Sequence, residues 1–169
     1  MTVYHGSYMQ IAAPRILVQE RGRDFGAGFY VTSLREQAER WAVRTARLRS
    51  RLTGQPAEAV VNQYAYDARA ADGLRVRDFP CADGDWLDFV VRCRSDAAFR
   101  HGYDVVSGRI ADDNVGETVE FVLAGVMRRE DAVARLRFSE SNDQICFCTE
   151  RALRLLSFAG SYVVGGEAR

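Results

Sequence analysis

The spacing of apolar residues changes repeatedly along the chain, and each change predicts a new element. Runs rich in β-branched and aromatic residues predict strands at residues 2–7, 28–32, 59–67, 74–79, 103–110 and 143–149, with a strand or loop at 16–20. Helical spacing predicts helices at 33–52, 85–94, 116–126 and 129–136, and a helix or turn at 150–158. This irregular mixture without repeats favours an α+β fold over a doubly wound parallel sheet.

The segment from residue 33 to residue 52 is the clearest element. Ser33 stands at the N-cap position and Glu36 three residues later completes a capping box, which predicts that the helix starts here. Leu34, Ala38 and Trp41 begin its apolar stripe. Its basic run, RTARLRSRL, is expected to be a solvated face, with a nucleic-acid patch as the alternative.

The length of 169 residues fits a single domain over 1–169 that buries its core without a metal or disulfide framework. Lys and Arg together equal Asp and Glu at 23 each, so the charge neither indicates nor excludes nucleic acid. The chain shows no secretory leader and no apolar window close to the ~18 residues of a membrane span. We therefore expect a cytoplasmic protein without a membrane partner.

The four cysteines add no second framework. Cys81, Cys93, Cys146 and Cys148 lack paired C-x-x-C spacing, so we interpret them as reduced, mostly buried thiols, with a disulfide or zinc site as the alternative. We expect no metal.

Two short motifs contain the candidate chemistry. The stretch DFGAGFYVT holds Gly26 and Gly28, which permit a positive φ or a close approach of the backbone, directly before Tyr30. It fits either a plain hairpin turn or a turn that meets a ligand lying across Tyr30. The stretch YHGS offers the His5 imidazole, an unobstructed amide at Gly6 and the Ser7 hydroxyl within one turn.

The order and spacing of these motifs resemble the ADP-ribosyltransferase superfamily, specifically its His-Tyr-Glu branch, which includes diphtheria toxin and the poly(ADP-ribose) polymerases. His5, Gly6 and Ser7 match the motif that holds the nicotinamide end of NAD. Gly26, Gly28 and Tyr30 match the stretch that supplies the tyrosine under the nicotinamide ring. Nearly the whole chain is also similar to a bacterial family of unknown-function proteins in that superfamily. The resemblance implies a split β-sheet core with flanking helices.

The resemblance also implies further roles. Trp41, eleven residues after Tyr30, matches a second aromatic that clamps the nicotinamide, and a plain core tryptophan is the alternative. Arg21 is expected to reach the pyrophosphate, in preference to Arg15 and Arg23, with a solvent-exposed position as the alternative. The loop RLRFSESND, before the last predicted strand, is expected to contact the acceptor.

The third motif is an acidic or amide residue that begins a late strand, where this chain has Asp143 and then Gln144. Neighbouring strand residues face opposite sides, so only one of the two enters the cleft. Asp143 shares its face with the larger apolar residues Ile145 and Phe147, which favours Gln144 as the residue that grips the ribose. Members of the branch that build polymers rely on Glu here, so the amide argues against chain elongation.

We therefore expect a mono-ADP-ribosyltransferase with His5, Tyr30 and Gln144 as catalytic residues and NAD as substrate. Its partners would be a macromolecular acceptor, protein or nucleic acid, and an antitoxin protein if the enzyme acts as a toxin or effector. The alternatives are an inactive module that binds NAD, ADP-ribose or a protein, and an NAD glycohydrolase.

Overall fold

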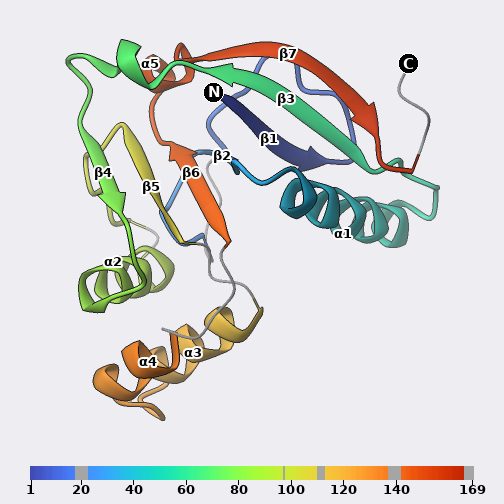
Figure 1. Cartoon of the computed structure of the whole chain (residues 1–169). Helices are drawn as coiled ribbons and strands as arrows, with labels where there is room; N and C mark the ends of the chain where they lie inside the picture. The colour runs from blue at the N-terminus through green and yellow to red at the C-terminus, as the bar shows by residue number, and fades with distance from the viewer. Residues whose placement is uncertain (18–22, 97, 110–112, 137–141, 166–169) are drawn as a thin grey trace.

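The computed structural model describes residues 1–17, 23–96, 98–109, 113–136 and 142–165, and these form two β-sheets flanked by helices (Figure 1). One sheet has the order β1-β3-β7, with β1 at Thr2–Ser7, β3 at Val60–Tyr66 and β7 at Leu156–Val163. The other has the order β2-β6-β5-β4, with β2 at Phe29–Val31, β6 at Asp143–Phe147, β5 at Val105–Arg109 and β4 at Val76–Phe79. The fold is α+β, as the sequence predicts, and within the second sheet β4 and β5 run parallel.

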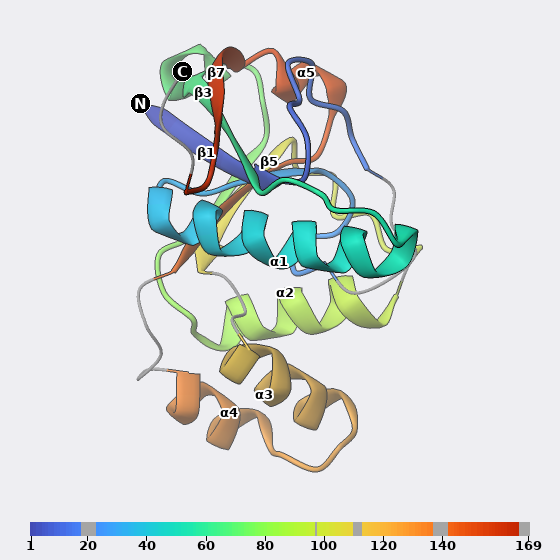
Figure 2. The same cartoon turned by 90° about the vertical axis from the view of Figure 1, so that its right-hand side faces the viewer.

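The helices lie on the outer sides of the two sheets. Helix α1 (Arg35–Thr53) packs against β1 and β3, while α2 (Gly84–Ser95), α3 (Asp113–Leu123) and α4 (Arg129–Leu136) cover the second sheet (Figures 1 and 2). The short helix α5 (Glu150–Leu153) and a 3₁₀ turn, η1 (Ala68–Ala71), complete the described elements. Among the described helices, none combines the length and the apolarity needed to cross a membrane.

Three apolar clusters hold these layers together. The first lies between the sheets and contains Phe29, Tyr64 and Phe147, among others. The second lies between the second sheet and α2 to α4, around the fully buried Trp86. The third is small, because α1 meets the first sheet mainly through Ala38 and Ala42. Helix and sheet therefore approach closely at this point.

Gly6 shows how close that approach is. A Cβ atom at this position would lie 2.2 Å from the carbonyl oxygen of Ala38 and 2.6 Å from the amide nitrogen of Ala42. Both are backbone atoms of α1 and cannot turn aside as a side chain can. Position 6 therefore requires glycine for packing, whatever else its backbone does.

A pair of backbone hydrogen bonds joins the two sheets. The amide of Tyr4 in β1 donates to the carbonyl of Thr32 at 2.8 Å, and the amide of Thr32 donates to the carbonyl of Tyr4 at 2.9 Å. This bridge lies directly after β2. On its other side, toward Gly6 and Tyr30, the two strands are not paired within the described part of the chain.

The predicted capping box at Ser33 and Glu36 is wrong. Helix α1 begins at Arg35 with Leu34 as its N-cap residue, which makes no side-chain cap. The amide of Ser33 instead donates to the carboxylate of Asp143, and the amide of Leu34 donates to the hydroxyl of Thr32. Because β6 supplies the acceptor from across the fold, the local sequence signal places the helix start two residues early.

The last strand is the other departure from the prediction. The short α5 ends at Leu153, and β7 already begins at Leu156 and pairs with β3, with one irregularity in register. Its burial is irregular along the strand, without a clean alternation, which explains why the pattern of apolar residues does not reveal it. The strands β3 and β4, consecutive in sequence, lie in different sheets.

The close approach at Gly6 generates a stability prediction. Replacing Gly6 by Ala forces β1 away from α1, and we expect the free energy of unfolding to fall by about 3 kcal/mol in urea denaturation. The control is Gly116→Ala in α3, where a Cβ would meet nothing closer than Arg94 at 4.0 Å. That variant should be unchanged or more stable by up to about 1 kcal/mol. Equal stability of both variants would contradict the packing role of Gly6.

Candidate active site

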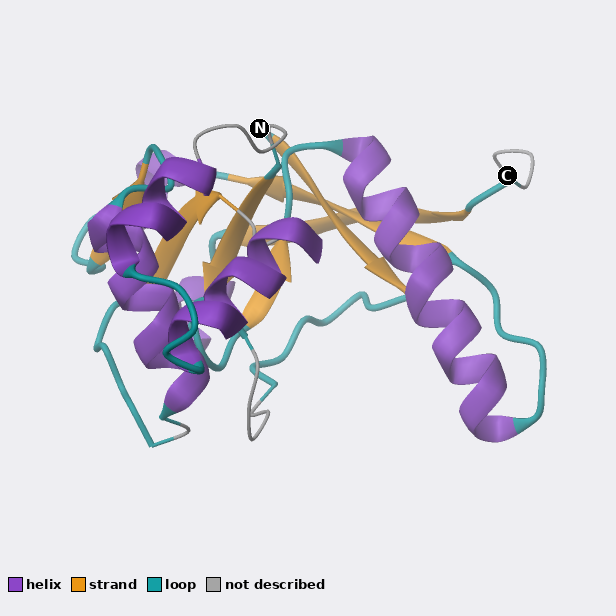
Figure 3. Ribbon diagram, turned by 90° about the horizontal axis from the view of Figure 1, so that it is seen from below, coloured by secondary structure: helices purple, strands orange, loops and turns teal. Residues whose placement is uncertain are grey.

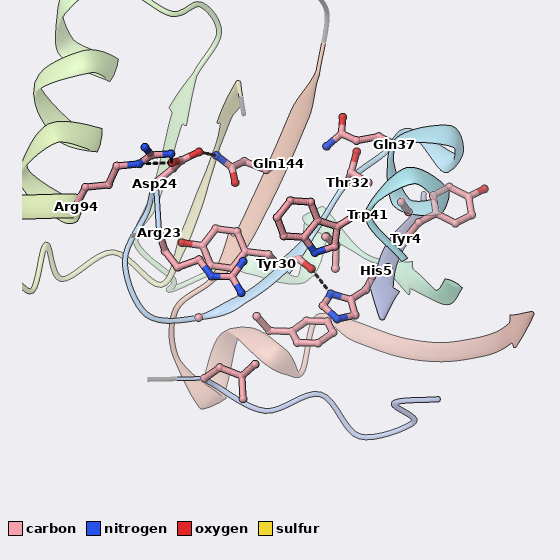
Figure 4. A pocket seen from close by; sticks show the side chains of 16 residues that line it. Tyr4, His5, Arg23, Asp24, Tyr30, Thr32, Gln37, Trp41, Arg94 and Gln144 are labelled. Carbon is pink, nitrogen blue, oxygen red and sulfur yellow. Dashed lines mark hydrogen bonds and ion pairs between the residues drawn. The ribbon is translucent and has the colours of Figure 1, made fainter. Parts of the chain in front are cut away.

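A pocket opens where β1 and β2 separate, between the sheet edges and α1 (Figure 4). Residues from five parts of the chain line it, and they include Tyr4, His5, Gly6, Arg23, Asp24, Gly28, Tyr30, Gln37, Trp41, Arg94 and Gln144. The structure thus brings His5, Tyr30 and Gln144, far apart in sequence, to the wall of a single cavity.

His5 is held by the strand across the opening. Its Nδ1 atom lies 2.6 Å from the carbonyl oxygen of Tyr30, and its ring stacks on Phe29 with centroids 4.5 Å apart. Burial of the ring lowers the pKa of His5 from 6.5 to about 4, against the raising effect of the Tyr30 carbonyl bond, and Arg23 lowers it further. The ring is therefore neutral at pH 7. Since a carbonyl only accepts, Nδ1 carries the proton and Nε2 is an acceptor.

The glycine turn positions Tyr30. The phenol hydroxyl of Tyr30 donates to the carbonyl of Gly26 at 2.6 Å and accepts from the amide of Phe25 at 3.1 Å. Gly26 has a φ of 77°, in the left-handed region that favours glycine. A Cβ at Gly28 would lie 2.3 Å from the Cys146 sulfur, so this glycine lets the turn approach β6. The hydrogen bonds from this turn to the Tyr30 hydroxyl fix the tyrosine ring at the wall of the pocket.

Trp41 reaches the pocket from α1. Its side chain is 41% exposed, which excludes the alternative of a core tryptophan, and the guanidinium of Arg44 lies 5.5 Å from its ring centre. Tyr30 and Trp41 therefore present aromatic faces to the same cavity from different elements (Figure 4).

Gly6 turns its backbone toward the opening. The N–H and C=O groups of one strand residue point to the same side, and the side alternates along the strand. Tyr4 directs both groups at Thr32, away from β3, so Gly6 two residues later directs its groups the same way. There the strands have separated, and a ligand in the pocket meets a donor and an acceptor.

Gln144 belongs to a buried polar chain that begins on α2. The guanidinium of Arg94 contacts the Asp24 carboxylate at 2.6 Å, and Gln144 donates from Nε2 to the other Asp24 oxygen at 2.8 Å. Asp24 and Gln144 are 6% and 5% exposed. Because a carboxylate only accepts, the amide nitrogen faces Asp24 and the amide oxygen points the other way (Figure 4). A glutamate at position 144 would set two carboxylates together, a cost that the amide avoids.

Asp143 has a different environment. Its carboxylate accepts from the Thr32 hydroxyl and the Ser33 amide, and its backbone is bonded at both ends to the side chain of Gln37. These bonds tie β6 to the segment between β2 and α1. The alternation expected for β6 is observed, because Gln144 lines the pocket and Asp143 does not.

The remaining predicted residues divide into three groups. Ser7 is buried in β1 and does not line this pocket as the described residues define it. Arg21 and residues 137–141 of the loop expected to contact an acceptor lie outside the described residues. Of the other two arginines considered, Arg15 is exposed, whereas Arg23 lines the pocket with its guanidinium 5.2 Å from the Tyr30 ring centre.

Comparison with known proteins gives one positive result. A family described as "Protein of unknown function (DUF3990)" matches residues 1–158. The chain belongs to the DUF3990 family. The comparisons found no match among curated proteins and none among solved structures. Family membership therefore leaves the function of this DUF3990 protein to be argued from the pocket.

Two parts of the DUF3990 pocket were missed in the sequence. Asp24 opens the stretch DFGAGFYVT, and a charge next to a glycine turn was the available signal. Arg94 ends a helix in which its charge looks like any solvent-facing residue, yet its side chain is 13% exposed. Its partner is 70 positions away in sequence, so nothing local marks it.

The cysteines are not among the residues that line the pocket. All four are free thiols, with Cys81 exposed, Cys93 and Cys146 buried and Cys148 half-buried. Within the described part of the chain, no group of three or more His, Cys, Asp or Glu side chains is placed to hold a metal ion.

The buried ion pair generates a prediction for the DUF3990 chain. Arg94→Met leaves the Asp24 carboxylate buried without its guanidinium, which should lower the free energy of unfolding by about 3–5 kcal/mol. The control is Arg135→Met, which breaks the exposed pair with Glu117 and should cost less than about 1 kcal/mol. Urea denaturation of both variants measures the difference. A loss at Arg94 no larger than at Arg135 would show that the buried pair does not hold the pocket wall.

His5 generates a pH prediction. Its depressed pKa means that the unfolded chain takes up a proton before the native state does. The stability that this site contributes is therefore complete above pH 6.5 and is lost as the pH falls through about 4. The NMR resonance of His5, assigned by its absence from His5→Gln, should titrate with a midpoint near 4. A midpoint above pH 6 would contradict the buried, neutral ring.

Proposed function

We propose that the chain is a mono-ADP-ribosyltransferase that uses NAD to modify a macromolecular acceptor. The observation that carries the proposal is the convergence of His5, Tyr30 and Gln144, from β1, β2 and β6, on one pocket. The two sheets that separate beyond the Tyr4–Thr32 bridge support assignment to the split-sheet fold of that superfamily.

The nicotinamide would lie between aromatic faces. Tyr30, fixed through its hydroxyl by the glycine turn, would provide one face, and Trp41 from α1 the other. The N–H and C=O of Gly6 would bond the carboxamide, because they point into the opening where no side chain blocks them. Such a site recognises a flat ring that carries a planar amide.

The ribose would meet two acceptors. Nε2 of His5 and the amide oxygen of Gln144 suit hydroxyl donors, and both are positioned by bonds from their other ends. Cleavage of the glycosidic bond develops positive charge on the ribose, so a neutral His5 does not oppose it. The carboxylate of Asp24, behind Gln144, adds a negative charge partly balanced by Arg94.

The pyrophosphate would be contacted by arginine. Arg23 lines the pocket on the side of Tyr30, and Arg94 lines it beside Asp24. Arg21 remains a candidate for the same role.

A binding module without catalysis is the second candidate, and the amide at Gln144 favours it, because no carboxylate of β6 would contact the ribose. An enzyme that transfers to water would be an NAD glycohydrolase. As a toxin or effector, the transferase would be controlled by an antitoxin protein.

Labelled NAD separates these functions. Nicotinamide release identifies an enzyme, and label carried onto protein or nucleic acid from a bacterial lysate identifies a transferase. We expect both. Release without macromolecular label would indicate the glycohydrolase, and NAD binding without release would indicate the module.

Two adjacent residues provide the sharpest variants. Gln144→Ala should lower kcat/KM for NAD at least about a hundredfold, because it removes a group that orients the ribose. Asp143→Ala should leave kcat/KM nearly unchanged, although it loses the bonds to Thr32 and Ser33 and should lower the unfolding midpoint. His5→Ala should lose about 10- to 100-fold in kcat/KM, the equivalent of one hydrogen bond. A fully active His5→Ala, or an inactive Asp143→Ala that remains folded, would reject the assignment.

A further inference from the structure

One side of α1 carries a line of exposed side chains, of which Leu48 and Leu52 have no part in the pocket. Trp41, Leu48 and Leu52 are 41%, 57% and 74% exposed, whereas Ala38, Ala42 and Ala46 on the adjoining side of the helix are buried. Their spacing, with Thr45 between the first two, is four, three and four residues. That is the spacing of the a and d positions of a coiled coil. We call these four residues the α1 seam.

Arginines flank the seam. Arg44 and Arg51 occupy the g positions next to it, and Arg40 and Arg47 lie farther round the helix. Arg49 occupies an e position, where its guanidinium lies 5.1 Å from the Tyr8 ring centre. From Arg40 to Thr53 the helix contains no acidic residue, while the whole chain has equal numbers of acidic and basic residues. The positive charge is therefore concentrated on this helix.

The α1 seam is accessible in the described structure. Seen from below, α1 crosses the view with the first sheet behind it and no other described element in front (Figure 3). Its length of about three turns, or ~17 Å from Trp41 to Leu52, is sufficient for one helix of a partner. One end of the seam is Trp41, which also lines the pocket.

We propose that the α1 seam binds an acidic amphipathic helix of a partner protein and thereby reaches the mouth of the pocket. Apolar side chains of the partner would cover Leu48 and Leu52, and its carboxylates would pair with Arg44 and Arg51. The leucines favour a protein over a nucleic acid, because phosphates and sugars gain little from two aliphatic side chains. The inference depends on the surface of α1 and not on the reaction at the pocket.

The test uses a synthetic probe of known chemistry. A fluorescein-labelled peptide of three heptads, with Leu at a and d and Glu at e and g, should bind the full chain in an anisotropy titration. The matched peptide with Lys at e and g should not bind. Failure of the acidic peptide to bind, or equal binding of both peptides, overturns the proposal.

Variants on one helix locate the contact. Leu48→Gln with Leu52→Gln should weaken binding at least about tenfold, and both residues are exposed, so circular dichroism should show an unchanged fold. Arg44→Ala with Arg51→Ala should weaken binding and reduce its dependence on salt. Arg47→Ala is the control of the same residue type and should bind like the parent chain. A loss at Arg47 as large as that at Arg44 and Arg51 would overturn the coiled-coil geometry.

Two further measurements complete the test. The acidic peptide should shift the tryptophan emission of the parent chain but not that of Trp41→Phe, because Trp86 is fully buried. An unchanged emission would overturn the link to the pocket. An oligothymidylate that binds more tightly than the peptide, and keeps its affinity in the leucine variant, would identify a nucleic-acid surface and reject the protein partner.

Discussion

Two backbone hydrogen bonds between Tyr4 and Thr32 set the geometry of the molecule. They join β1 of the first sheet to the residue that follows β2 of the second, and the pocket opens beside them. Beyond this bridge, toward Gly6 and Tyr30, β1 and β2 are no longer paired. The backbone groups of Gly6 and the ring of Tyr30 therefore face the pocket. The cavity is thus a consequence of strand pairing that stops after one bridge.

Electrostatics then distinguishes the two ends of the cavity. At one end His5 is neutral, because burial lowers its pKa more than the hydrogen bond to the Tyr30 carbonyl raises it. At the other end one oxygen of the Asp24 carboxylate pairs with Arg94, and the other accepts a hydrogen bond from Gln144. A ligand therefore meets neutral acceptors directly and a carboxylate only through an amide. This arrangement accounts for glutamine at a position where a carboxylate would repel Asp24.

Local patterns predicted most of the secondary structure, and the failures have a common cause. The strands β1, β2, β5 and β6 and the helices α2 and α4 follow from apolar spacing. Ser33 failed as a cap because its amide is satisfied by Asp143, 110 positions away. The prediction missed the strand β7 because burial does not alternate regularly along it.

The pocket residues also divide into those that a local motif indicates and those that depend on a partner far away in sequence. Motif spacing indicated His5, Tyr30, Trp41 and Gln144, whose types and order are unusual in combination. Arg94 and Asp24 gave no comparable signal, since a single arginine on a helix is ordinary until its partner is known. Gly6 was selected for its backbone groups, and the structure adds a packing requirement that the sequence does not express. Sequence reasoning therefore recovered the motif residues that line the pocket better than the buried charges that support them.

The burial of β6 on both faces has a consequence for how this family can vary. Ile145 and Phe147 fill the core between the sheets, while Cys146 belongs to the core beneath α2. Losing or gaining one residue within β6 would exchange the two sets and move Asp143 or Ile145 into the place of Gln144. Among related chains, insertions and deletions should therefore occur in the loop before β6, whereas β6 itself should vary only by substitution. We expect related chains to align through β6 without gaps, which would make this strand a fixed reference for comparing their pockets.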